Sequence, residues 1–214
     1  MIFFLGDSMK GVDLMLDLQG ALFSYMKLKA PIDDFIDIEV ETVEEVEKDE
    51  IASIFASKIG APNYDVAELV LILYEPSEYE ILISKGWVRI SCIPELLEAV
   101  KEALKELKTV KTFSVTVKVT EEEALRYIVK MAKLIGDVKS GVSIDENTIE
   151  RKTTFNIDYS NLGITLTITE RIYVHDKIER DYSVSVELKS KEGIDVNSAL
   201  RFLNSTLGIQ GMSI

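Results

Sequence analysis

The sequence predicts an α+β fold of two successive units, each with a strand, a helix, three or four antiparallel strands and a second helix. Three observations predict this fold. Apolar and polar residues alternate in several short runs, a pattern typical of half-buried strands. Turn residues such as Glu75-Pro76-Ser77 and Lys85-Gly86 separate neighbouring runs, which favours hairpins. After Thr109 the same order of elements begins again.

The chain therefore divides into an arm and two units. Residues 1–33 form an N-terminal arm of one strand and one helix, residues 34–110 form the first unit, and residues 111–214 form the second. The alternative is an α/β N-terminal half followed by an α+β C-terminal half, with parallel strands joined by crossover helices. Those strands would be Ile2–Leu5, Phe35–Val43 and Ala67–Tyr74.

In the arm, Ile2–Leu5 reads as a short strand and Ser8 to about Lys29 as a helix that ends before Pro31, because the residue before a proline avoids helical angles. The first unit opens with Phe35–Val43, a strand with one apolar and one acidic face. A helix follows and ends at Gly60. We expect it to bury Ile51, Ile54, Phe55 and Ile59.

Three antiparallel strands complete the sheet of the first unit. They are Ala67–Tyr74, Tyr79–Ile83 and Trp87–Ser91. Pro94 then begins a helix, where its missing N–H is not needed. Its predicted inner stripe is Leu96, Leu97, Val100, Leu104 and Leu107.

The second unit opens with an alternating strand from Phe113 to Val119. Thr120 and Glu123 form a capping box, in which each side chain satisfies a free backbone N–H of the helix that follows. We expect that helix to bury Ala124, Ile128, Met131, Ala132 and Ile135, and to end at Gly136. Three or four strands follow, at about Val142–Glu146, Arg151–Tyr159, Ile164–Val174 and Ile178–Lys189, of which the first has the weakest pattern. Asp195 then caps a last helix, which ends at Gly208.

Part of the first unit resembles the first repeat of the TATA-box-binding protein family. Glu75-Pro76, a strand, Gly86, a strand with Val88 and Ile90, and a helix from Pro94 occur in the order and spacing of that repeat. The resemblance covers about Phe35 to Lys108, and the second half shares only the order of elements. It implies a saddle-like antiparallel sheet with its helices on the convex side, and a role connected with transcription.

The binding residues of that family are only partly matched. Its members insert phenylalanines into the minor groove and thereby kink the DNA. The corresponding positions of the first repeat fall near Val66 and Ile83, which are apolar but not aromatic, and Trp87 stands where the family has a lysine. The resemblance therefore implies Val66, Ile83 and Trp87 as residues of a binding face on which DNA binding is weakened or lost.

Alternation along the strands predicts the rest of this face. If Ile36, Ile38 and Val40 face the helices, the carboxylates of the same strand lie on the open face, where they would repel phosphates. These are Asp37, Glu39 and Glu41. The second half should be rich in hydroxyl groups instead, with Ser114, Ser183 and Ser185 beside the candidate binding residues. Those candidates are Thr116, Lys118, Thr165, Thr167, Thr169, Arg171 and Tyr173.

The composition of the chain limits the kinds of partner and the cellular location that we expect. The formal net charge of −13 disfavours DNA and anionic membranes as partners. The single cysteine, Cys92, excludes an internal disulfide and reads as a small buried residue. With no secretion signal and no apolar run of spanning length, we expect a cytoplasmic protein. Scarce glutamine beside abundant Glu, Lys and Ile is typical of thermophiles.

Motifs that would indicate an enzyme are incomplete. Gly6 and Gly11 have the spacing of a phosphate-binding loop, but Val12 and Asp13 replace its lysine and hydroxyl residue. The Gly-Asp-Ser block near the N-terminus lacks the Asp-x-x-His of the esterases that carry it, and His175 is the only histidine. We therefore expect no catalytic residues, no metal site and no cofactor.

These observations favour a non-enzymatic binding protein. Its partner would be another protein or a second copy of the chain, because an exposed sheet face can bind another polypeptide. DNA stays open as a partner but is disfavoured by charge. One alternative is a small-molecule binder that grips an apolar ligand between a helix and a curved sheet. The other is an uncharacterised α/β enzyme.

Overall fold

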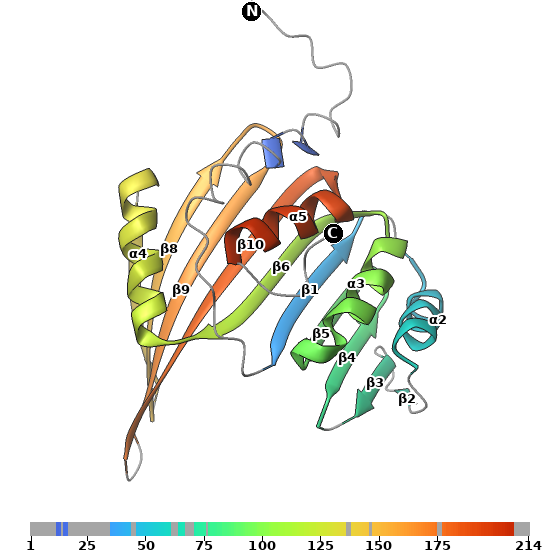
Figure 1. Ribbon diagram of the computed structural model, residues 1–214, viewed down its shortest axis with the longest axis horizontal. Helices are drawn as coiled ribbons and strands as arrows, with labels where there is room; N and C mark the ends of the chain where they lie inside the picture. Colours follow the sequence, from blue (N-terminus) through green and yellow to red (C-terminus); the bar gives the residue numbers. More distant parts are fainter. Residues whose placement is uncertain are drawn as a thin grey trace, which may run out of the picture.

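The computed structural model describes residues 12–13, 15–16, 35–43, 46–60, 64–66, 71–75, 77–135, 138–145, 147–174 and 177–207. Within them it has an α+β fold dominated by one antiparallel sheet, with helices on one face (Figure 1). The predicted strand Ile2–Leu5 and most of the predicted helix Ser8–Lys29 lie outside the described residues.

The order strand, helix, four strands, helix occurs twice along the described chain. The first set comprises β1 (Ile36–Thr42), α2 (Lys48–Ile59), β2 (Tyr64–Val66), β3 (Leu71–Glu75), β4 (Tyr79–Ser84), β5 (Trp87–Cys92), the 3₁₀ turn η1 (Pro94–Leu96) and α3 (Leu97–Glu106). The second set comprises β6 (Thr109–Val119), α4 (Glu121–Ile135), β7 (Val138–Asp145), β8 (Thr148–Asp158), β9 (Gly163–Val174), β10 (Ile178–Asp195) and α5 (Val196–Leu207).

These strands form a single ten-stranded sheet in the order β2-β3-β4-β5-β1-β6-β10-β9-β8-β7. The first strands of the two sets, β1 and β6, pair at its centre, and the others follow outward in matching order (Figure 1). Both neighbours of β1 are antiparallel to it. The alternative with a parallel N-terminal half is therefore wrong for the described strands.

The first unit has one strand more than the three that its sequence suggested. The additional strand, β2, pairs with β3, and it was missed because it is only three residues long and carries a polar residue, Asp65, at its centre. Residues 67–70 of the predicted strand Ala67–Tyr74 lie outside the described residues, and β3 begins at Leu71.

The core lies between the helices and one face of the sheet. Ile36, Ile38 and Val40 of β1 are buried there, as their alternation predicted. Five apolar residues of α5 are buried as well. They are Val196, Ala199, Leu200, Leu203 and Leu207.

Helix α4 buries Ala124 and Met131 as predicted, and Ile128 packs against the core, but two other positions differ from the prediction. Tyr127 is buried, and its hydroxyl donates a hydrogen bond to the Thr206 carbonyl at 3.2 Å, whereas Ala132 is exposed. Because Tyr127 is the larger residue, burying it removes more apolar surface from water than burying Ala132 would. The prediction was therefore wrong for Ala132 and missed Tyr127, while the rest of the described stripe faces the core.

Two glycines are required by the backbone. Gly60 ends α2 in the left-handed conformation, with φ of 74°. Gly193, with φ of 98°, lies where the pairing of β10 with β6 shifts register between Lys189 and Ile194. A Cβ at Gly193 would lie 2.5 Å from Cγ2 of Thr109, so only glycine fits this bulge.

Candidate binding surface

The face of the sheet opposite the helices is polar, and none of the described helices covers it (Figure 1). We call it the open face and define it by Asp37, Glu39 and Glu41 of β1 together with the residues in register with them. Strand alternation produces it, since successive side chains point to opposite faces. Ser91, Arg89 and Trp87 of β5 lie opposite the three carboxylates on one side. Thr116, Ser114 and Thr112 of β6 lie opposite them on the other.

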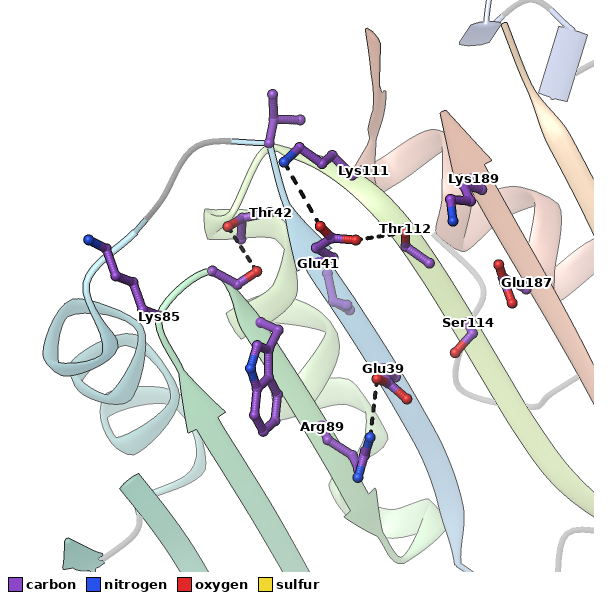
Figure 2. Close-up of a pocket in the computed structure, with 14 residues that line it drawn as sticks. Glu39, Glu41, Thr42, Lys85, Arg89, Lys111, Thr112, Ser114, Glu187 and Lys189 are labelled. Atoms are coloured by element: carbon purple, nitrogen blue, oxygen red, sulfur yellow. Dashed lines mark hydrogen bonds and ion pairs between the residues drawn. The ribbon is translucent and has the colours of Figure 1, made fainter. Parts of the chain in front are cut away.

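Each carboxylate of this row is held by a neighbouring strand. Asp37 accepts a hydrogen bond from the Ser91 hydroxyl at 2.7 Å. Glu39 pairs with the Arg89 guanidinium at 3.3 Å (Figure 2). Glu41 accepts a hydrogen bond from the Thr112 hydroxyl at 3.2 Å and lies 3.9 Å from the Lys111 ammonium. The row is therefore fixed in place but stays exposed to solvent.

A hollow of about 640 Å³ lies over one end of this row. Glu39, Glu41 and Ser114 line it, together with three lysines from the β4–β5 turn, β6 and β10 (Figure 2). These lysines are Lys85, Lys111 and Lys189. Trp87 also lines the hollow, and the guanidinium carbon of Arg89 lies 5.8 Å from its ring centroid, within cation–π range. An aromatic ring among paired charges is suited to contact with a polypeptide.

The second half of the open face is lined mainly by hydroxyl groups. Thr116 donates a hydrogen bond to Ser185 at 3.0 Å, and Thr165 donates one to Asn156 at 3.2 Å. A second hollow, of about 550 Å³, lies over this region. Its lining includes six of the predicted binding residues, Thr116, Lys118, Thr167, Thr169, Arg171 and Tyr173.

Two cations of this half, Lys152 of β8 and Arg171 of β9, share one carboxylate on β8. Glu150 lies 2.7 Å from the Lys152 ammonium and 2.8 Å from Nε of Arg171. Hydrogen bonds from these two cations lower the pKa of Glu150, and the Glu150 carboxylate raises the pKa of Arg171. The sequence did not predict that Glu150 and Lys152 lie on the open face, because the pairing of β8 with β9 cannot be read from β8 alone. The charges of these two cations are therefore partly offset by Glu150.

Of the ten predicted binding residues, eight lie on the open face by register. They are Trp87, Thr116, Lys118, Thr165, Thr167, Thr169, Arg171 and Tyr173. Ile83 is wrong as a binding residue, since it is fully buried on the helix side of β4. Val66 lies in β2 opposite Leu71, and Leu71 lies opposite Ile83. A role in binding for the eight residues stays a prediction.

The described residues contain no cluster of three or more histidine, cysteine, aspartate or glutamate side chains placed to hold a metal ion. Cys92 is fully buried, and His175 lies outside the described part of the chain. None of the helices in the described ranges has the length and apolar character needed to cross a membrane. The sequence matches no model of a known protein family, and no curated protein matches it significantly.

Proposed function

We propose that the chain is a non-enzymatic interaction protein on a scaffold like that of the TATA-box-binding protein, and that its open face binds another protein. One observation carries the proposal, which is a broad sheet face that none of the described helices covers, with an aromatic ring and fixed carboxylates beside a hollow of about 640 Å³. The matching outward order of strands from β1 and β6 supports the scaffold and an internal duplication.

The charge of the face supports a protein partner over DNA. Asp37, Glu39 and Glu41 form a row along β1, one of the two central strands of the sheet. Such carboxylates oppose the phosphate contacts that provide most non-specific DNA affinity. A protein segment with basic and apolar side chains would instead complement the acidic row and Trp87.

The packing of the helices does not support a helix-grip binder. The space bounded by Met131, Phe155 and Phe202, between sheet and helices, has no volume that admits a water molecule. An apolar ligand there would have to displace core side chains, at a cost of several kcal/mol. The open face, by contrast, already offers volume without rearrangement.

Charge reversal on the open face tests the proposed function. We expect the intact chain to capture a protein partner, and the double substitution Glu39→Lys with Glu41→Lys to weaken capture at least about tenfold, because two attractive contacts become repulsive. The matched control reverses two exposed carboxylates on α4, Glu121→Lys and Glu122→Lys, and should leave capture unchanged.

The alternative that the open face binds DNA is tested with the same purified chains. Fluorescence anisotropy with an AT-rich duplex at low salt should show no binding by the unmodified chain. Salt-dependent binding that survives in the α4 control would contradict the proposal, and so would a partner that both double variants capture equally well.

A further inference from the structure

Strand β7 forms one edge of the sheet, and its outer side is open. Among the described residues it pairs only with β8, in an unbroken register from Val138 opposite Phe155 to Asp145 opposite Thr148. The N–H and C=O groups on its other side therefore have no strand beside them in the described part of the chain. An edge of this kind is a template for a further strand.

This edge lacks two of the features that usually protect sheet edges, proline and a bulge, although it carries the charged Lys139. Its eight residues include no proline, and no bulge interrupts the register with β8. The opposite edge of the sheet, β2, has only three residues, which is itself a protective feature. The two edges thus differ, and only β7 is long and regular enough to pair stably.

Three side chains of β7 are apolar, although every residue of the strand is exposed. Val138, Val142 and Ile144 are 41%, 61% and 77% exposed. Val138 lies opposite the buried Phe155, so all three lie on the helix side of the sheet, where the core would continue if it were covered. Exposed apolar groups in a row beside a free backbone edge indicate an interaction surface.

We propose that β7 pairs with β7 of a second copy of the chain, in antiparallel orientation about a two-fold axis, so that the sheet continues from one protomer into its partner. The sequence of β7 is self-complementary in one register. With Val142 opposite the partner's Val142, Lys139 lies opposite the partner's Asp145, and this pair occurs twice because the contact is symmetric.

In this register, the paired side chains have opposite charges, and the apolar side chains of both copies lie on the same face of the sheet. Lys139 and Asp145 lie on the open face, and opposite charges across a strand pair stabilise it. Val142 and Ile144 of both copies come together on the helix side, where their apolar surface would be removed from water. A second copy therefore supplies hydrogen bonds, charge pairs and apolar cover at once.

The oligomeric state of the full chain tests the proposal. We expect sedimentation velocity to show a concentration-dependent dimer. Ile144→Lys should weaken association about tenfold or more, because a buried edge contact would become charged. Ile178→Lys is the matched control, since Ile178 is 70% exposed but lies on β10, away from this edge. It should leave the dimer intact. A monomer at every concentration, or equal loss in both variants, would overturn the proposal.

Cysteine crosslinking tests the register. The only native cysteine, Cys92, is fully buried, so an introduced thiol has no exposed competitor. Val142→Cys should form a covalent dimer with a short bismaleimide. Ile144→Cys should not, because its two copies would lie roughly 14 Å apart along the strands. Equal crosslinking at both positions would refute this register.

A charge exchange gives an independent result. Lys139→Asp and Asp145→Lys should each weaken the dimer, and the double variant should recover it. Both single variants keep the alternation of β7, and circular dichroism verifies that each chain is folded. Failure of the double variant to recover the dimer would also refute the proposed register.

Discussion

The thiol of Cys92 is an ionisable group that is buried in the core. It lies on β5 opposite Ile36 on one side and Tyr79 on the other, and it is fully buried. Burial first, and the negative charge of Asp37 second, raise the pKa of its thiol to about 12, from a reference value of 9.0. The thiol is therefore neutral and packs as a small apolar residue, as its place in the sequence predicted.

This pKa gives a pH-dependent stability. The folded chain keeps the thiol proton while the unfolded chain loses it above about pH 9, so the contribution of Cys92 is complete below pH 9 and declines as the pH rises towards 12. The decline is about 1.4 kcal/mol for each pH unit. Cys92→Ala should be less stable than the unmodified chain at pH 8, and this difference should shrink by pH 10.

Urea unfolding of both chains at pH 8, 9 and 10 measures this difference. Tyr127 also has a raised pKa because of burial, but it is present in both chains and cancels in the comparison. Free energies of unfolding that fall in parallel for the two chains would contradict the prediction.

Among the elements, local signals predicted several helix boundaries, whereas β6, β7, β8 and β10 extend beyond their predicted bounds. Gly60 ends α2, and the Thr120 hydroxyl accepts a hydrogen bond from the Glu123 N–H at 3.3 Å at the start of α4. These signals depend only on neighbouring residues.

The burial of Lys101 on α3 was not predicted. Its ion pair with Glu98 at 3.0 Å and its apolar stem allow this charged residue to lie beneath the helix surface.

The binding surface was less predictable than the elements. Alternation sorted the residues of β6, β9 and β10 onto the correct face, because that property is local to each strand. The position of Ile83 was wrong because it was carried over from a family repeat, whereas the alternation within β4 places it in the core. The contribution of β8, including Glu150 and Lys152, depends on pairing between strands and could not be read from one segment.

The N-cap residue of α5, Asp195, should contribute to the stability of the chain. Asp195 accepts a hydrogen bond from the Ser198 N–H at 2.9 Å, which satisfies one free donor of the first turn. Asp195→Ala should lower the free energy of unfolding by about 1 kcal/mol. Asp195→Asn keeps an oxygen acceptor and should cost much less. Chemical denaturation followed by circular dichroism measures both variants, and an equal loss would show that the charge, rather than the cap, is responsible.

At the scale of the molecule, the two units share one sheet and one core. Ile38 of β1 lies between Ile90 of the first unit and Val115 of the second, and all three are buried. The buried residues of both units belong to one cluster. Neither unit can therefore lose its structure without exposing apolar surface of the other, which favours cooperative unfolding.

The only tryptophan, Trp87, reports on the first unit and allows this coupling to be tested from the second. Leu166 lies on β9 and is 2% exposed, so Leu166→Ala should destabilise the chain by about 3 kcal/mol. If unfolding is cooperative, the Trp87 fluorescence transition moves to lower denaturant by the same amount as the far-ultraviolet circular dichroism. Ile81→Ala, at a buried position within the first unit, is the matched control and should move both signals together. A Trp87 transition that stays in place in Leu166→Ala would show that the first unit unfolds independently, despite the continuous pairing of β1 with β6.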